Sequence, residues 1–407
     1  MCADINKRMV RSLYLYSRYI TSIALSHYRR VLLTDLGRFF RKGSRIMPEQ
    51  GYSKAEREAA LSAAVQWLIT ASEKMQDDGM GSFHLARGWS SSYPETTGYL
   101  VPTLLEYARH TGVSDASEVA LKAARWLLLI QKASGGWQGG RVGENRPEIV
   151  FNTGQVIRGM LSAYDWTGEP KFLDSAVRAG DWLAEVQHPD GYWKAHALMN
   201  EPRVYDAFVD FPLLQLFRQT RNVRYKEAAE RNIHWIIEQK QHSNGWFEDC
   251  DNTVRHNDRP ILHTLAYTID GLLDCGLYLQ DESVVRSALL PAERLRDMFL
   301  AHRFLYGRYD GSWNGSEYSI LTGCAQMSLL WMKAWEYGND GSYREAALKM
   351  ADKLILLQQI GGHGDINTRG GLPGSYPIWG KYEPFAFPNW ATKFFADALM
   401  RLLARDS

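Results

Sequence analysis

The sequence repeats one unusual pattern, a glycine-rich stretch that begins with glutamine and ends on an aromatic ring. Clear copies run from Gln131 to Trp137, from Gln187 to Trp193 and from Gln239 to Trp246. Successive rings are separated by 54, 56, 53, 67 and 50 residues, which marks a repeat architecture rather than separate domains. The six places in this series, three of them in weaker copies, are Phe83, Trp137, Trp193, Trp246, Trp313 and His363.

The segments between these stretches have the apolar periodicity of helices, with almost no strand-like alternation. Short turns alternate with loops of roughly 14–29 residues, much longer than ordinary helix–helix connections. Because paired helices run antiparallel, all long loops lie at one end of the array, where function is expected. We expect one or two helices within 5–41, and then twelve near 53–77, 96–112, 115–133, 152–168, 170–187, 206–220, 222–241, 260–280, 282–304, 319–338, 341–358 and 388–405.

Six helical hairpins can either close into a ring or form an open solenoid. An open solenoid needs a polar outer face on its terminal repeats. The last predicted helix, residues 388–405, has the apolar character of an inner helix instead. The sequence therefore predicts an all-α fold, an (α/α)6 toroid formed by residues 51–407, preceded by a helical extension of residues 1–50.

Basic residues are concentrated in this extension. Residues 1–45 contain ten Lys and Arg residues and two Asp residues, although the whole chain has a net charge of only +1. A basic leader on an acidic body is typical of an arm that docks on a membrane or a protein, and a helix that simply packs on the barrel is the alternative. The near-neutral total gives no indication of nucleic-acid binding.

The cysteine pattern indicates a cytoplasmic protein. Cys2, Cys250, Cys275 and Cys324 are few and scattered, no signal peptide precedes them, and we interpret them as reduced thiols. Residues 19–26 are too short and too polar a stretch to span a bilayer. We therefore predict a cytoplasmic location, peripheral at the inner face of the membrane if the extension binds lipid.

The repeated tryptophans have a structural interpretation. Glycine lets the chain leave a helix sharply, after which the ring folds back into the gap between adjacent hairpins, where aromatic groups dominate packing. A second interpretation has one or two of these rings facing a cleft and stacking on a sugar. The aromatic candidates for substrate binding are Trp89, Trp137, Trp193, Trp246, Trp313, Tyr376 and Trp390.

The helices that follow the long loops start with Ser, Thr or Asn, which we interpret as N-caps. About one turn further on, these helices carry side chains that capping does not require. In a toroid these helices form the inner wall, so such residues would ring the cavity floor and hydrogen-bond a sugar. The predicted substrate-binding residues of this group are Tyr99, Asn152, Gln155, Asp210, Gln326 and Lys393, with Tyr267 at a corresponding place.

Carboxylates and histidines at the long-loop end supply candidate catalytic groups. Glu95 is either an acid/base or an anion that stabilises a helix N-terminus. Asp249 and Asp251 belong to a cluster in which carboxylates raise one another's pKa, and a solvated acidic turn is the alternative. The stretches 313–317 and 376–383 complete the rim of the site. The predicted catalytic residues are Glu95, Asp249, Asp251, His263 and Tyr267.

We expect neither a metal ion nor a cofactor. Asp249, Cys250, Asp251, His256 and His263 lie close together in the sequence but lack the paired spacing of structural zinc sites. The chain also lacks a Gly-rich phosphate loop and a dinucleotide-binding fingerprint.

The Gln…Gly-x-Trp repeats resemble those of squalene–hopene cyclases and prenyltransferase β-subunits, over about residues 53–405. Such repeats mark the toroid more than a reaction. The cyclase resemblance implies an Asp-x-Asp-Asp proton donor, whereas the nearest match here is Asp249-Cys-Asp-Asn252. The prenyltransferase resemblance implies a zinc triad, which the spacing of Asp249, Cys250 and His263 does not match.

Other stretches resemble glycan enzymes built on the α/α toroid. Gly135-Gly-Trp, Asn152-Thr-Gly-Gln and Phe172-Leu-Asp-Ser-Ala are similar to the helical domain of glucuronyl C5-epimerases. Residues 371–395 are similar to proteins of bacterial polysaccharide assembly. We find no counterpart of the β-rich region of those epimerases in the sequence, so the resemblance implies the fold and a glycan substrate but not the reaction.

We therefore predict a carbohydrate-active enzyme that acts on an oligo- or polysaccharide, with uronic-acid-containing exopolysaccharide or capsule as the expected material. Its reaction would be cleavage of a glycosidic bond by two carboxylates or removal of the C5 proton of a uronate. Two further hypotheses stay open. One is an isoprenoid enzyme of the cyclase and prenyltransferase kind, and the other is a non-catalytic scaffold of a glycan-assembly complex.

Overall fold

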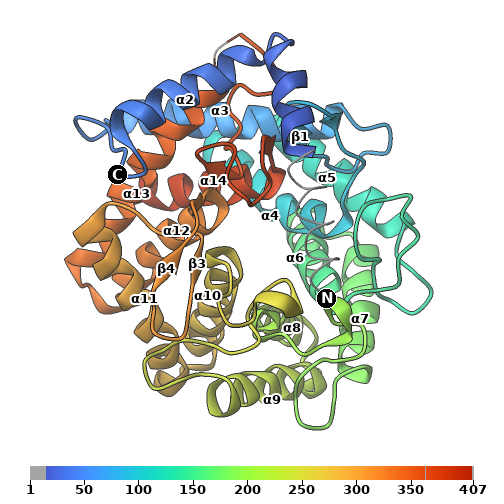
Figure 1. Cartoon of the computed structure of the whole chain (residues 1–407). Coiled ribbons are helices and arrows are strands. Elements are labelled where there is room, and N and C mark those ends of the chain that lie inside the picture. Colours follow the sequence, from blue (N-terminus) through green and yellow to red (C-terminus); the bar gives the residue numbers. More distant parts are fainter. Residues whose placement is uncertain (1–14, 363, 406–407) are drawn as a thin grey trace, which may run out of the picture.

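The computed structural model describes residues 15–362 and 364–405, so His363 and residues 1–14 of the predicted extension lie outside the described residues. Helices α3 to α14 form two concentric rings (Figure 1). The outer ring consists of α3 (Lys54–Glu73), α5 (Ser114–Leu129), α7 (Pro170–Glu185), α9 (Val223–Gln239), α11 (Glu282–His302) and α13 (Gly341–Gln358). The inner ring consists of α4 (Pro94–Thr111), α6 (Val150–Thr167), α8 (Ala207–Thr220), α10 (Leu262–Leu279), α12 (Leu321–Gly338) and α14 (Asn389–Leu403).

Both rings are closed. Each inner helix packs on the next, from α4 through α6, α8, α10 and α12 to α14, and α14 returns to α4. The outer helices complete the same circuit, because α13 packs on α3. The predicted (α/α)6 toroid is therefore confirmed, and each predicted helix end lies within four residues of the observed one.

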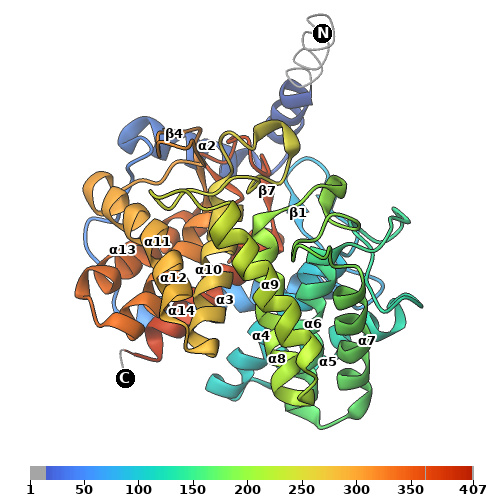
Figure 2. The same cartoon turned by 90° about the horizontal axis from the view of Figure 1, so that it is seen from below.

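The long loops lie at one end of the toroid and pair through short antiparallel strands (Figure 2). In the first sheet, β1 (Phe83–His84) lies between β2 (Gly88–Trp89) and β7 (Ala386–Phe387), which joins the first long loop to the last. These pairings fix the loops around the mouth of the ring. The remaining strands are β3 (Arg308–Tyr309) paired with β4 (Gly315–Ser316), and β5 (Ser319–Ile320) paired with β6 (Ser375–Tyr376).

The aromatic rings of the clearest repeats are buried between hairpins. Trp137 donates its indole N–H to Leu127 O at 2.9 Å, and Trp193 donates to Leu183 O at the same distance. The two acceptors lie at equivalent places near the ends of α5 and α7. Each ring thus plugs the space behind its own outer helix, as the structural interpretation predicts.

The glutamine and the glycine of each repeat contribute to the contact between neighbouring hairpins. Gln131 donates from Nε2 to Gly135 O in its own loop and to Ser175 O of α7, the next outer helix. Gly135 has a φ of +101°, and a Cβ at this position would lie 2.3 Å from Arg178 O. Gln187 makes the equivalent pair of bonds one unit further on, to its own loop and to α9. The repeat therefore encodes the contact between neighbouring hairpins.

The inner helices begin without side-chain caps, so the capping prediction is wrong. Within the described chain, none of the six has a side-chain hydrogen bond at its N-cap. Thr97 and Thr153 lie at the fourth helical position instead. Their hydroxyl groups accept the backbone N–H groups of Met80 and Trp137, each at 3.0 Å. These threonines fasten the aromatic loops to the inner wall.

The described part of the extension lies on the long-loop end of the toroid (Figures 1 and 2). Residues 15–24 are helical, and α2 (Arg29–Lys42) follows after a short turn. Across residues 15–362 and 364–405, every helix is too short or too polar to cross a bilayer.

Candidate functional site

A central cavity of about 330 Å³ lies at the long-loop end of the toroid. Its wall comes from the first turns of α4, α6, α10 and α14 and from the loops around them. The second residue of each of these four helices lines the cavity, because these four inner helices enter the ring in the same register. These residues are Glu95, Phe151, His263 and Trp390.

Aromatic rings close the cavity from below. The centroid of the Tyr267 ring lies 4.6 Å from that of Phe208 and 5.7 Å from that of Phe394. Tyr99 lies 5.7 Å from Phe394 by the same measure. Because these residues come from α10, α8, α14 and α4, they form an aromatic floor across the ring.

Glu95 has the properties of an acid/base group. Its carboxyl group lines the cavity at the start of α4. Burial raises the pKa of Glu95 to about 7, and a hydrogen bond with Tyr93 offsets only part of this effect. A carboxyl group of this kind is protonated in about half of the molecules at neutral pH, so it can either donate or accept a proton.

Tyrosine hydroxyl groups surround this carboxyl group. Burial raises the pKa of Tyr93, Tyr99, Tyr205, Tyr267 and Tyr382 well above the usual value, so all five stay protonated hydrogen-bond donors at neutral pH. Tyr99 and Tyr267 interact with one another through their hydroxyl groups, and the charge of Glu95 contributes to the raised pKa of both.

His263 is held as a neutral ring. Burial lowers its pKa to about 4, although a hydrogen bond with Gln326 acts in the opposite direction. The Nδ1 atom lies 2.7 Å from Gln326 Oε1, and this carbonyl oxygen can only accept, so Nδ1 carries the proton. The lone pair is therefore on Nε2, and His263 has the form of a general base.

A second carboxylate and an arginine complete the cavity. Glu383 lies on the loop before α14, and burial raises its pKa despite the attraction of Arg141 and Arg87. Arg141 comes from the loop before α6 and also lines the cavity. The sequence predicts Glu383 only as part of the rim stretch 376–383. Its backbone φ of +44°, which turns the loop at this residue, gives no signal in the sequence.

The structure brings a part of the predicted site together. Predicted catalytic residues in the cavity lining are Glu95, His263 and Tyr267. Predicted substrate-binding residues in the lining are Tyr99, Asn152 and Trp390.

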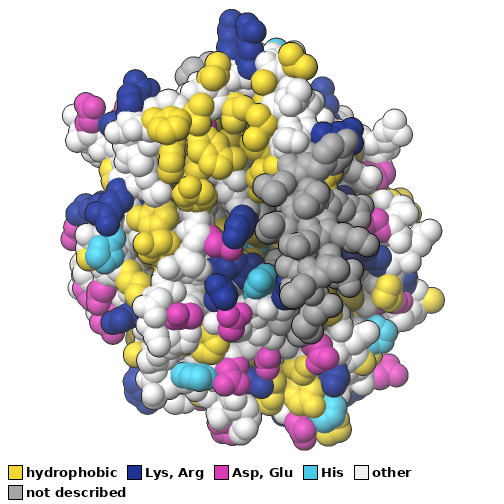
Figure 3. Space-filling model, in the orientation of Figure 1, with side chains coloured by type: hydrophobic (Ala, Val, Ile, Leu, Met, Phe, Trp, Pro, Cys, Tyr) yellow, Lys and Arg dark blue, Asp and Glu magenta, His cyan; other side chains and the backbone are white. Residues whose placement is uncertain are grey.

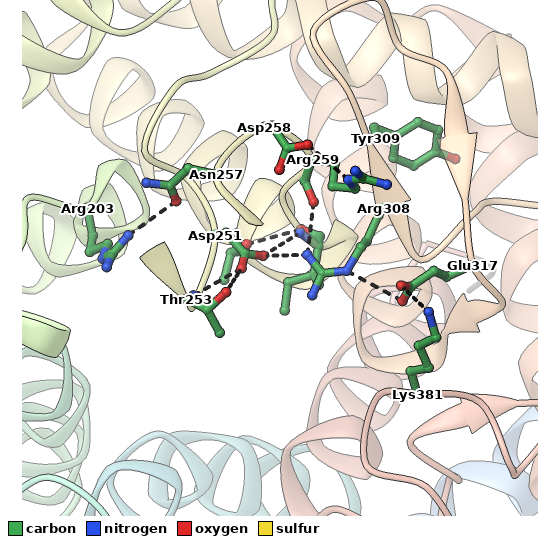
Figure 4. Close-up of polar contacts among 12 residues, drawn as sticks. Arg203, Asp251, Thr253, Asn257, Asp258, Arg259, Arg308, Tyr309, Glu317 and Lys381 are labelled. Atoms are coloured by element: carbon green, nitrogen blue, oxygen red, sulfur yellow. Dashed lines mark hydrogen bonds and ion pairs between the residues drawn. The ribbon is translucent and has the colours of Figure 1, made fainter. Parts of the chain in front are cut away.

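Asp249 and Asp251, predicted as catalytic, do not line this cavity. Asp249 pairs with Lys240 at 2.8 Å and accepts a hydrogen bond from Asn257 at 3.0 Å. Asp251 is fully buried, and its carboxylate accepts hydrogen bonds from Arg308, Thr253 and the backbone N–H of Ile261 (Figure 4). Their carboxylates have structural partners, so the geometry gives no support to a catalytic role.

Arg308 links this carboxylate to the rest of the rim. Its guanidinium lies 2.9 Å from Asp251 and 3.4 Å from Glu317, which in turn pairs with Lys381 at 2.8 Å (Figure 4). Glu317 follows β4, and Lys381 lies in the loop between β6 and β7. The acidic cluster of the sequence therefore ties three long loops to one another.

Six aromatic candidates also lie outside the cavity lining. Trp246 and Trp313 are buried, and each donates its indole N–H to a carbonyl of the loop that carries the other. Trp89 donates to Asn367 at 2.8 Å. The others are Trp137 and Trp193, buried between hairpins as described above, and Tyr376, which is buried and whose hydroxyl donates to Gly43 O.

The remaining predicted wall residues face other parts of the structure. Gln155 is buried and accepts a hydrogen bond from Arg158 at 3.0 Å. Asp210 points to the outer ring, where it accepts from Asn232 at 2.8 Å. Lys393 pairs with Asp397 at 2.6 Å and lies outside the cavity lining. Gln326 also lies outside the lining, where it orients His263. These four residues lie at the fourth to sixth positions of their helices, and each has a partner within the protein.

The fold of this chain is similar to that of several proteins of known structure. No protein-family model and no curated protein sequence matches the chain. Among solved structures, an unsaturated glucuronyl hydrolase specific for heparin superposes with a TM-score of 0.70 at 13% identity, over 87% of this chain and 98% of that one.

Two further solved structures share the fold. The unsaturated glucuronyl hydrolase of Bacillus sp. GL1, responsible for the degradation of glycosaminoglycan, gives a TM-score of 0.66 at 15% identity, over 85% of this chain and 96% of that one. A sugar epimerase from a ruminal bacterium gives a TM-score of 0.65 at 11% identity, over 87% of this chain and 99% of that one. The predicted resemblance to glycan-processing α/α-toroid proteins is confirmed at the level of the fold.

Proposed function

We propose that the chain is a glycan-processing enzyme whose cavity holds an acidic sugar of an oligo- or polysaccharide. The observation that carries the proposal is Glu95, a carboxyl group with a pKa of about 7 inside a cavity lined by hydrogen-bond donors. Perturbed carboxyl groups in a concave site are characteristic of acid/base catalysis. The solved toroids named above, which include glucuronyl hydrolases and an epimerase, support a saccharide substrate.

Cleavage of a glycosidic bond is the reaction that we favour. Glu95 would give its proton to the bridging oxygen as the bond between this oxygen and the sugar carbon breaks. A water molecule would form the new bond to that carbon and lose its proton to His263 Nε2. Tyr99, Tyr267 and Asn152 would hold the sugar hydroxyl groups, with Arg141 beside a uronate carboxylate.

Epimerisation at C5 of a uronate is the second candidate. His263 can serve this reaction as well, because its pKa of about 4 leaves the ring free of a proton throughout the neutral range. His263 would remove the C5 proton, and Glu95 would return one to the opposite face. The two reactions differ in their products, since only cleavage releases a new reducing end.

The cavity lining gives less support to an isoprenoid enzyme or to a scaffold. An isoprenoid enzyme needs a cavity lined almost wholly by aromatic groups, whereas Glu95, Asn152, Arg141 and Glu383 line this one. A non-catalytic scaffold does not require a carboxyl group with a raised pKa inside a cavity that is closed by an aromatic floor. The cytoplasmic location and the link to exopolysaccharide or capsule production stay predictions.

The test is a screen of the purified protein against uronate-containing oligosaccharides, both saturated and carrying an unsaturated terminal uronate. Reducing-end release and exchange of C5 hydrogen for solvent deuterium are measured in parallel. Glu95→Gln, which keeps the shape of the side chain, is expected to lower kcat by roughly 10²–10⁴-fold.

Substrate binding by Glu95→Gln separates loss of chemistry from loss of the site. We expect the variant to bind the sugar with nearly unchanged Kd, measured by calorimetry. Asp251→Asn serves as a carboxylate control outside the cavity and is expected to lower stability but not kcat of the folded protein. Full turnover by Glu95→Gln would refute the assignment.

A further inference from the structure

Large apolar side chains are exposed on the described part of the extension. Leu25 is 85% exposed, Leu33 is 60% exposed and Phe40 is 79% exposed. Leu33 and Phe40 are separated by two helical turns, so they lie on the same face of α2. Exposed apolar groups of this size that recur along one face mark an interaction surface.

Basic side chains accompany these apolar groups. Residues 15–45 contain seven Lys and Arg residues and one acidic residue, Asp35. Arg29, Arg30 and Arg41 are exposed, and the described residues provide no carboxylate within ion-pair distance of any of them. The outer surface of the extension is therefore cationic as well as apolar.

Asp35 does not reduce this positive charge at the surface. It is fully buried and accepts the backbone N–H of Ile378 at 2.6 Å. Burial raises the pKa of Asp35 to about 7, so the group is partly neutral at physiological pH.

The opposite side of the extension is fixed to the toroid. Arg38 donates to Leu356 O at 2.7 Å, and Lys353 donates to Ser44 O at 3.1 Å. The Phe39 ring packs edge-on against Trp379, with centroids 5.6 Å apart. The apolar groups on the outer face are thus held in fixed positions and are not part of a freely moving tail.

The extension also lies at the end of the molecule that carries the cavity. It rises from the long-loop face in Figure 2, and the cavity is built from the same loops. In Figure 3 hydrophobic side chains gather on the upper part of this face, with Lys and Arg at its edges.

We propose that residues 15–45 bind the surface of an anionic phospholipid membrane. The apolar side chains Leu25, Leu33 and Phe40 enter the interface, and Arg29, Arg30 and Arg41 lie among the lipid phosphates. This combination of an apolar stripe with flanking arginines fits an amphipathic helix that lies in the plane of a membrane. Charge complementarity favours an anionic bilayer over a protein partner, because every exposed ionised side chain of the segment is basic.

Co-sedimentation of the full chain with vesicles tests the proposal. Vesicles of phosphatidylcholine alone are compared with vesicles that also contain phosphatidylglycerol, at low and high salt. We expect binding to the anionic vesicles that weakens as salt rises. Leu25→Ser/Leu33→Ser/Phe40→Ser and Arg29→Gln/Arg30→Gln/Arg41→Gln should each reduce the partition coefficient about tenfold or more.

Matched substitutions at the other end of the toroid control for general surface effects. Val223 and Arg286 are exposed on α9 and α11 near the short turns, and Val223→Ser/Arg286→Gln should bind vesicles as the unmodified chain does. Circular dichroism confirms that each variant is folded. Failure of the unmodified chain to bind anionic vesicles at low salt, or unchanged binding by both triple variants, would overturn the proposal and leave a protein as the partner of this surface.

Discussion

Glu95 and Asp251 are both shielded carboxyl groups at the long-loop end, yet their surroundings give them different properties. Asp251 accepts hydrogen bonds from Arg308, Thr253 and a backbone N–H, which fix its carboxylate in place. Glu95 has Tyr93 as its polar partner, so burial dominates and its neutral form is favoured. Glu95 can therefore act as the proton donor of the site because no cationic group among the described residues contributes to lowering its pKa.

The pH dependence of activity follows from this difference. Burial raises the pKa of Glu95 from its ordinary value to about 7. If protonated Glu95 is the acid, kcat/KM falls about tenfold per pH unit above pH 7, because only the protonated form reacts. The measurement is kcat/KM between about pH 5 and pH 9. Activity that rises with pH in this range would make Glu95 a base.

Gln326 is expected to act through His263. In Gln326→Leu, Nδ1 loses its acceptor, and the proton is no longer confined to that nitrogen. We expect a lower kcat with little change in KM, and nitrogen NMR of the imidazole should report a mixture of tautomers. A single Nδ1-protonated tautomer in the variant would contradict this role. Gln326→Glu restores an acceptor at the same place and serves as the rescue variant.

Single residues also mark the limit of what the sequence indicates. Glu95 could be identified because it directly precedes a predicted inner helix. The ion pair between Asp251 and Arg308 could not be predicted, because Arg308 lies 57 positions further along the chain and reaches Asp251 only through loop packing. Asp249 and Asp251 were therefore predicted to be catalytic, whereas Glu383 was predicted only as part of the rim stretch 376–383.

At the level of elements, the repeat specifies the joints between hairpins. Gly135 adopts a φ of +101°, and a Cβ would lie 2.3 Å from Arg178 O of α7. Gly135→Ala combines backbone strain with a clash against a rigid helix, so we expect a loss of roughly 2–4 kcal/mol in the free energy of unfolding. Chemical denaturation monitored by tryptophan fluorescence measures it.

Gly143→Ala is the matched control for this prediction. Gly143 has a φ of +90°, but no atom lies within 4 Å of its Cβ position. Only backbone strain then destabilises the variant, and the expected loss in the free energy of unfolding is about 1 kcal/mol. Equal losses in the two variants would mean that the contact with α7 does not matter.

The element bounds were predictable because amphipathic periodicity is a local property. The helical positions that face the cavity were not predictable in the same way. The inner helices begin on Pro94, Val150 and Leu262, before the polar residues that suggested caps. The second helical position therefore reaches the cavity wall, together with two tyrosines one turn further in. Glu95 and His263 both occupy that second position.

At the scale of the whole molecule, the aromatic floor divides the lumen of the ring into two compartments. Below it lies a second hollow of about 340 Å³, lined by charged side chains of the inner helices. Asp270 and Asp274 of α10 face Lys333 of α12 there. Lys393 lies in this compartment, where it pairs with Asp397, and this explains why it does not reach the upper cavity. A ring closure can be predicted from six repeats, but this division depends on side-chain packing across the ring.

The lower compartment should contribute to the stability of the entire ring. Lys333 Nζ lies 2.7 Å from Asp270 and 2.8 Å from Asp274. Burial alone would lower the pKa of Lys333, but the attraction of the two carboxylates outweighs it and raises the pKa. Lys333→Met leaves both carboxylates shielded from solvent without the cation that contacts them directly, and we expect a loss of roughly 3–5 kcal/mol in the free energy of unfolding. Lys349→Met removes an exposed partner of Glu345 on α13 and should cost less than about 1 kcal/mol. Similar losses in the two variants, measured by urea denaturation, would show that the charges inside the ring do not hold α10 and α12 together.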